Sequence, residues 1–66
     1  MKIIDYSSRP ERELSQVYIS LTKEEMKEFR DSLDLLLNDS DLSRHEHINN
    51  KEFDKEITIE FDHWSM

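Results

Sequence analysis

The sequence predicts an α+β fold, in which one helix packs on one face of a small, mostly antiparallel sheet. Three observations carry this prediction. Over residues 22–37, apolar side chains recur every three or four positions, which is the period of an amphipathic helix. Over residues 16–21 and again over 55–62, apolar and polar residues alternate, which is the period of a half-buried strand. With 66 residues the chain has room for a single domain, expected to span residues 1–66.

Two further strands rest on shorter patterns. Residues 2–6 are β-prone and contain two adjacent isoleucines. Residues 42–50 are open to either a strand or a loop, and we place a short strand at 44–48. Residues 7–13 are polar and hold the only proline, so we expect an exposed loop there. The predicted order of elements is therefore strand, strand, helix, strand, strand.

The helix has defined start and stop signals. Thr22 is a good N-cap, and Glu25 three residues later completes a capping box. Asn38 is expected to end the helix in the left-handed conformation that glycine usually supplies. The two aspartates that follow oppose the helix dipole, which makes the stop definite.

The apolar faces of the helix and strands define the expected core. Its members are Val17, Ile19, Leu21, Met26, Phe29, Leu33, Leu36, Leu37, Ile57, Ile59 and Phe61. The sequence contains no second helix to cover the other face of the sheet. That face, or a sheet edge, is therefore expected to pair with another subunit, and a homodimer is the expected assembly.

The charge distribution excludes several kinds of partner. The formal net charge is −7, and residues 23–66 hold all of it while residues 1–22 are neutral. Binding a phosphate backbone needs clustered lysine and arginine, which the sequence lacks. Neither nucleic acid nor a membrane is an expected partner. The acidity favours solubility first, with a basic protein partner as the alternative.

Two residue types are absent, and each absence is informative. Without cysteine there are no disulfides or thiolate metal sites, and with no apolar signal-peptide stretch the expected location is cytoplasmic. Without glycine, the standard phosphate and dinucleotide loops are excluded, so no cofactor is expected. Any tight turn that needs a positive φ must use asparagine or aspartate.

His45 and His47 form the one group with possible metal chemistry. On a strand they point to the same side, about 6.5–7 Å apart along the chain, so they could share a metal. His63 or an acidic residue would then be the third ligand. The plainer interpretation is two exposed histidines on a polar strand that faces many carboxylates. A metal-binding module or metal-dependent enzyme centred on this segment is therefore an alternative.

Four residues are candidates for an interaction surface. Leu35 projects into the polar face of the helix, which suggests contact with a second chain or with the C-terminal tail. Tyr18 and Thr58 lie on the uncovered sheet face, and Trp64 in the C-terminal tail is expected to dock on something.

Residues 17–25, which run from a strand into a helix, resemble the start of ribbon–helix–helix DNA-binding proteins. That resemblance implies a second helix over residues 43–55 and outward side chains that read DNA. Here the outward residues are Gln16, Tyr18 and Ser20, and the net charge also argues against DNA binding.

A second resemblance covers residues 17–61, through the Leu-Thr-Lys-Glu-Glu helix start, the His-Glu-His segment and the Glu-Ile-Thr-Ile strand. The chain is similar here to small uncharacterised bacterial proteins, which implies an α+β fold and no known activity. No catalytic motif rises above chance. The expected function is therefore regulation by protein–protein contact, of the kind performed by immunity proteins or antitoxins, rather than catalysis.

Overall fold

The computed structural model describes residues 1–62, which form one helix and four strands. In chain order these are β1 (Ile3–Asp5), β2 (Arg12–Leu14), α1 (Lys23–Asn38), β3 (His45–Asn49) and β4 (Glu56–Glu60). The α+β class and the order of elements are as predicted. The strands form two antiparallel two-stranded ribbons, β1–β2 and β3–β4, where a single sheet was expected.

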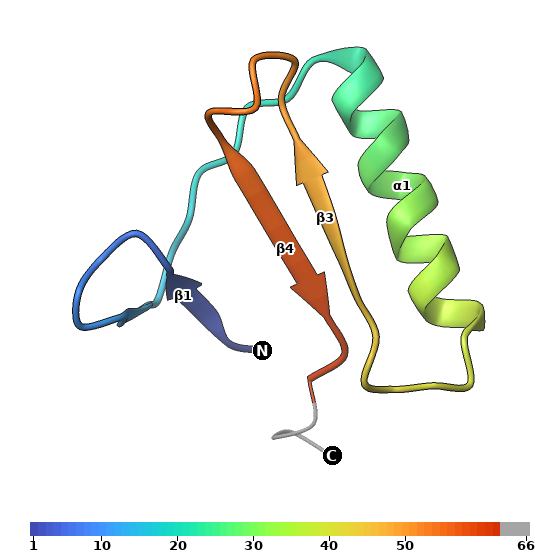
Figure 1. The fold of residues 1–66 in the computed structure, drawn as a ribbon, viewed down its shortest axis with the longest axis horizontal. Coiled ribbons are helices and arrows are strands. Elements are labelled where there is room, and N and C mark those ends of the chain that lie inside the picture. The colour runs from blue at the N-terminus through green and yellow to red at the C-terminus, as the bar shows by residue number, and fades with distance from the viewer. Residues whose placement is uncertain (63–66) are drawn as a thin grey trace.

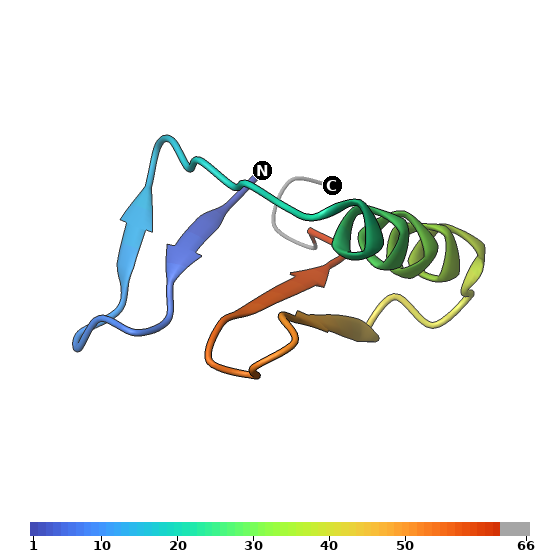
Figure 2. The ribbon, with the colours of Figure 1, turned by 90° about the horizontal axis from the view of Figure 1, so that it is seen from above.

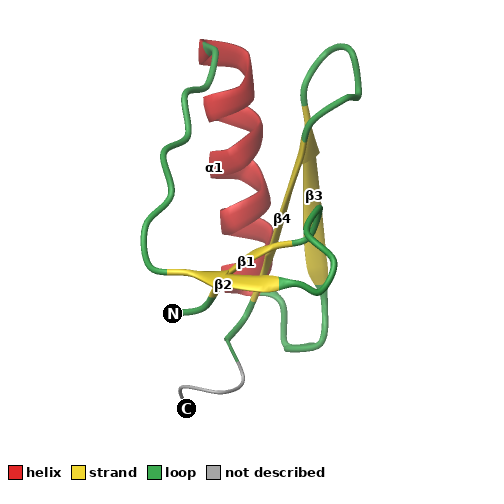
Figure 3. Ribbon diagram, turned by 90° about the vertical axis from the view of Figure 1, so that its left-hand side faces the viewer, coloured by secondary structure: helices red, strands yellow, loops and turns green. Residues whose placement is uncertain are grey.

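The helix belongs with the second ribbon. α1 lies along β3, and β4 lies on the far side of β3 from the helix (Figure 1). The β1–β2 ribbon stands to one side of this unit (Figure 2), and its strands run across the direction of α1 and β4 (Figure 3). The amino group of Met1 lies 3.2 Å from a carboxylate oxygen of Asp62, which joins the ends of the described chain.

The predicted strand at residues 16–21 is wrong as a paired strand. Residues 16–20 belong to no strand. The partner of β1 is β2, which begins at the end of the predicted loop 7–13 and extends one residue beyond it. Opposite charges in register, Asp5 against Arg12, favour this pairing. An alternating pattern predicts which side chains share a face, but it does not supply a neighbouring strand to pair with.

The start of α1 follows the capping prediction. Glu25 N–H donates to Thr22 Oγ1 over 3.2 Å, and Thr22 N–H donates to Glu25 Oε1 over 2.9 Å. The end differs from the prediction, because Asn38 stays in the helix and Asp39 follows in an extended conformation. The Asn38 side chain donates instead to the carbonyl of Asp34, at 2.8 Å. A side-chain hydrogen bond to the preceding turn thus replaces the left-handed cap.

The turn between β3 and β4 is organised by Asn50. Its side-chain oxygen accepts hydrogen bonds from the backbone N–H groups of Asp54, at 3.1 Å, and Lys55, at 2.9 Å. The expectation that a positive-φ position would hold asparagine or aspartate is wrong here, because that position is Phe53, with a φ of 57°. Such a conformation is costly for an aromatic residue. The hydrogen bonds of Asn50 offset that cost by holding the backbone on either side.

The packed interior is small and lies between α1 and β3. One stripe of α1, with spacings of four, three and four residues, faces inward: Glu25, Phe29, Ser32 and Leu36. Ser32 is buried, and it lets the helix approach the strand closely. Ile48 of β3 is 3% exposed, and it is the only large apolar side chain that is buried among residues 1–62.

The predicted core is therefore only partly correct. Five of its members are half-buried: Leu21, Phe29, Leu36, Ile57 and Ile59. The other six are exposed: Val17, Ile19, Met26, Leu33, Leu37 and Phe61. Ile48 was missed. The apolar face of α1 is wider than the two-stranded ribbon can cover, so a second stripe of the helix remains in solvent.

Replacing Thr22 with alanine tests the capping box. The change removes the side-chain acceptor for Glu25 N–H, and we expect the free energy of unfolding to fall by about 1 kcal/mol. Urea denaturation followed by circular dichroism measures the loss. Thr22→Ser keeps the hydroxyl and should retain nearly all of the stability. Equal stability of the two variants would show that the cap contributes nothing.

Candidate functional site

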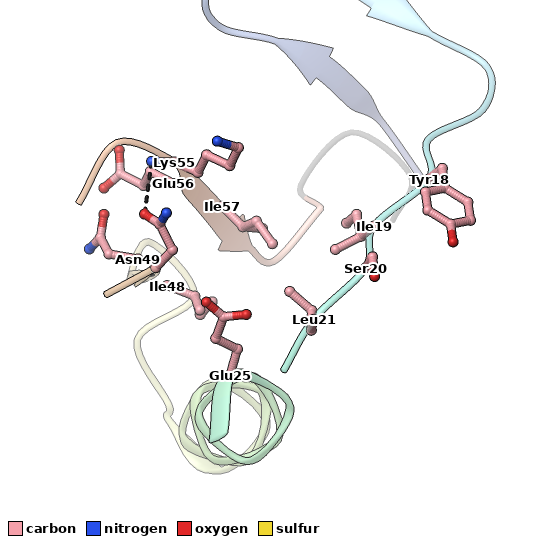
Figure 4. Close-up of a pocket in the computed structure, with 11 residues that line it drawn as sticks. Tyr18, Ile19, Ser20, Leu21, Glu25, Ile48, Asn49, Lys55, Glu56 and Ile57 are labelled. Atoms are coloured by element: carbon pink, nitrogen blue, oxygen red, sulfur yellow. Dashed lines mark hydrogen bonds between the residues drawn. The ribbon is translucent and has the colours of Figure 1, made fainter. Parts of the chain in front are cut away.

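An apolar groove opens between the extended segment 18–21 and the β3–β4 ribbon. It has a volume of about 310 Å³ and is lined by residues 18–21, 48–50 and 55–57 together with Glu25 of α1. Ile19 and Leu21 point across the groove towards Ile57, and Tyr18 points away from the ribbon (Figure 4). The walls of the groove therefore come from segments that alternate apolar and polar residues, with the apolar side turned inward.

The segment that forms one wall has no pairing partner within residues 1–62. No backbone–backbone hydrogen bond joins residues 15–21 to the rest of that region, and these residues are exposed apart from Leu21. Residues 14–22, which include this segment, also form the longest uncharged run in the whole sequence. Backbone N–H and C=O groups that face solvent in an extended segment are a template for another strand.

The other face of the β3–β4 ribbon is polar. His47 lies directly opposite Thr58 in the register, and its Nδ1 is 3.1 Å from Thr58 Oγ1 and 2.8 Å from Glu56 Oε1. The rings of His45 and His47 meet edge to face, with centroids 4.8 Å apart. His45 faces Glu60 across the ribbon. The predicted same-side placement of the two histidines is therefore found, and His47 links the two strands.

This arrangement does not by itself make a metal site. Among residues 1–62, no three histidine, cysteine, aspartate or glutamate side chains are grouped as metal ligands would be. Nδ1 of His47 is already engaged with Glu56 and Thr58. His63, the third ligand considered, lies outside the described residues. The pair His45 and His47 remains a metal-binding prediction, and its observed chemistry is cross-strand hydrogen bonding.

The predicted interaction residues fall on different surfaces. Tyr18 is 91% exposed at the rim of the groove. Thr58 lies on the polar face, beside His47. Leu35 is exposed on α1, about 90° around the helix from the packed stripe. Trp64 lies outside the described residues. Of these residues only Tyr18 lies at the groove, and Thr58 and Leu35 lie on other surfaces.

A further stripe of α1 is exposed, although its residues were predicted to lie in the core. Met26, Leu33 and Leu37 lie about 90° from the packed stripe, on the side opposite Leu35, and all are exposed. Leu37 is 82% exposed. Their spacing made them core candidates, and the pattern could not reveal that nothing in residues 1–62 covers them. The sequence did contain one indication of this exposure, because the apolar face of the helix is wider than two short strands can cover.

Among the described residues, three aspartates have a lowered pKa: Asp5 at the end of β1, and Asp41 and Asp54 in loops. The hydroxyl and backbone N–H of Ser43, at 2.6 and 3.0 Å, lower the pKa of Asp41 because they donate to its charged form. Ser7 lowers the pKa of Asp5 in the same way, and the side chain of Asn50 lowers the pKa of Asp54. In each case the hydrogen bonds favour the charged carboxylate.

Comparisons with protein-family models, with curated proteins and with solved structures give no match for this chain. Within the described residues, no helix is both long enough and apolar enough to span a bilayer. The second helix implied by the ribbon–helix–helix resemblance is not present, because residues 43–55 contain β3 and the turn before β4. The function must therefore be argued from the surfaces described above.

Replacing Ser43 with alanine tests the loop electrostatics. Without the donating hydroxyl, the pKa of Asp41 should rise towards its ordinary value of 3.8, which an NMR titration of the carboxyl carbon measures. Because the folded pKa is depressed, this contact stabilises the fold above pH 3.8 and is lost as the pH falls through the folded pKa. The variant should therefore be less stable than the wild type at neutral pH, and the difference should vanish in acid.

Ser40→Ala is the matched control, because Ser40 lies in the same loop and is not a donor to Asp41. An unchanged Asp41 titration in Ser43→Ala would exclude the hydroxyl hydrogen bond as a cause of the shift, since the backbone N–H of residue 43 remains a donor.

Proposed function

We propose that this protein is a small acidic regulatory protein that acts by protein–protein contact as a homodimer. The observation that carries the proposal is the amount of apolar surface that the single chain leaves exposed. The proposal assigns no catalytic step. We further propose that the protein is cytoplasmic and belongs with small uncharacterised bacterial proteins. Its partner would be a basic protein, regulated in the manner of immunity proteins or antitoxins.

The exposed area is larger than a compact chain of this mass should have. The accessible surface is 6104 Å², whereas a compact monomer of 8.0 kDa exposes about 4,450 Å². The radius of gyration, 12.8 Å, also exceeds the roughly 10.8 Å expected for 66 residues. The excess area is about 1,650 Å² per chain. Burying it between two copies would make an interface of about 3,300 Å², within the range of obligate homodimers.

Apolar side chains account for much of this exposure. The exposed large apolar side chains among residues 1–62 include Val17, Tyr18, Ile19, Met26, Leu33, Leu37 and Phe61. They belong to the extended segment before α1, to the uncovered stripe of α1 and to the residue after β4. So many exposed large apolar side chains are typical of a chain with interaction sites rather than of a free monomer. One helix and two ribbons offer too little structure to cover it.

The charge supports a basic partner. The net charge is −7, and Glu56 and Glu60 lie on the polar face of the β3–β4 ribbon, with Glu56 also at the edge of the groove and Glu60 outside it. A surface of one sign attracts a partner of the other sign and accelerates its association. The two faces of the ribbon would then have separate tasks, since the apolar side serves assembly and the acidic side serves recognition.

The homodimer is tested with Leu37→Ser. Because Leu37 is 82% exposed, the change should alter the stability of a free monomer by less than about 0.5 kcal/mol. In a dimer that covers the stripe, it should weaken association measurably. Sedimentation velocity over a range of concentrations gives both results. Leu35→Ser, on the opposite side of the helix, shows whether that exposed leucine shares the interface or whether the stripe with Leu37 carries it alone. A wild type that stays monomeric at high micromolar concentration would contradict the proposal.

The partner is tested by affinity capture from the native cell. The wild type is compared with the double variant Glu56→Gln with Glu60→Gln, which keeps the shape of the polar face and removes two charges. We expect a basic protein to be retained by the wild type, and to be lost from the variant and at high salt. A captured protein that is acidic, or one that resists both changes, would refute the role of charge.

A further inference from the structure

We infer that the extended segment 16–22 is a dimerisation strand, which pairs antiparallel with the same segment of a second copy of this chain. The inference rests on the proposed homodimer and names the part of the surface where the two copies meet. It explains three features of the segment together: its extended backbone without a partner, its lack of charge, and the groove beside it.

The backbone of the segment is prepared for pairing. It is extended up to Thr22, which has φ −68° and ψ 166°, and no backbone–backbone hydrogen bond joins residues 15–21 to another part of residues 1–62. Both of its edges therefore present N–H and C=O groups. The alternation of Val17, Ile19 and Leu21 with polar residues is the pattern of a strand that is covered on one face. An extended segment of this kind acquires its hydrogen bonds when another strand is added.

The lack of charge selects a second copy as the occupant. Two copies that each carry −7 repel one another, and like charges placed opposite each other in a sheet destabilise it. Residues 14–23 are the longest stretch without an acidic side chain, and all of them except Lys23 are uncharged, so two copies can meet there without opposing two carboxylates. A twofold axis at Ile19 places the uncharged residues 16–22 of one copy directly against those of the other.

The same axis satisfies the side-chain pattern. In this register Ile19 faces Ile19 of the second copy, and Val17 faces Leu21 of the second copy. A shift by one residue would place apolar residues against polar ones, because the side-chain period of a strand is two. The sequence is therefore self-complementary about Ile19, as an interface with twofold symmetry requires.

The groove provides the space beneath the added strand. Ile19 and Leu21 already turn towards Ile57 across about 310 Å³ (Figure 4). In a two-stranded ribbon, the apolar residues of the second copy lie on the same face as those of the first, so they cover the groove and shield Ile57 from water. The excess accessible area of each chain, about 1,650 Å², is large enough to include this contact.

Disulfide trapping tests the register directly, because the natural chain contains no cysteine. Residues directly opposite in an antiparallel pair have Cα atoms about 4.5–5.5 Å apart, within the range that a disulfide spans. Ile19→Cys is therefore expected to form a covalent dimer under mild oxidation. A mixture of the single variants Val17→Cys and Leu21→Cys should form a mixed dimer. Ser40→Cys, in an exposed loop beyond α1, is the control for random collisions.

Two further measurements do not depend on a cysteine variant. Ser20→Pro removes one backbone donor from each strand but suits an extended, unpaired backbone, so it should keep the helix content and weaken dimerisation roughly tenfold or more. Ser20→Ala is its control. In the wild type, amides of residues 16–21 should become protected from hydrogen exchange as the concentration rises.

The outcomes separate this inference from the proposed function. If the wild type is a dimer, but Ile19→Cys forms no more covalent dimer than Ser40→Cys and Ser20→Pro stays dimeric, the strand inference is overturned while the homodimer stands. Fast exchange of the amides of residues 16–21 in a dimeric wild type would also overturn it, since the segment would then have no partner strand. If the wild type is monomeric, both proposals fail.

Discussion

The contact between α1 and β3 is the constraint on which the rest of the structure depends. Ser32 allows the helix to lie close to the strand, and Ile48 fills the space between them. One helix covers one side of a two-stranded ribbon, and nothing else in residues 1–62 extends that interior. The stripe on α1 and the segment before it consequently keep their apolar side chains in solvent. A fold with so small an interior is marginal on its own, so its stability depends on what covers those surfaces.

The parts of the fold that sequence could predict are those set by local physics. The capping box at Thr22, the helix and the alternation of β4 each depend on residues close in the chain, and each is found near its predicted place. The pairing of residues 16–21 depends on a distant partner, which an alternating pattern does not specify. Phe53 at positive φ depends on the hydrogen bonds of Asn50, which no propensity of phenylalanine would suggest.

The candidate site was predictable in its components and not in their arrangement. Spacing placed His45 and His47 on one side of a strand, and the structure agrees, but it also joins His47 to Glu56 and Thr58 through a strand pairing that spacing cannot supply. Tyr18 was selected as uncovered surface, and it does lie at the rim of the groove. The groove itself follows from the path of residues 18–21 past the ribbon, which is a property of the tertiary structure.

The uncharged segment before α1 also has a consequence for colloidal behaviour. Proteins commonly guard an open strand edge with a lysine or another charge on the strand itself. Here residues 15–22 hold no such charge, and the repulsion between molecules comes from the net −7 elsewhere in the chain. This repulsion acts at long range, so it weakens as the ionic strength rises and disappears near the isoelectric point of about 4.8. In mildly acidic or concentrated salt solutions, the open strand would begin to drive precipitation.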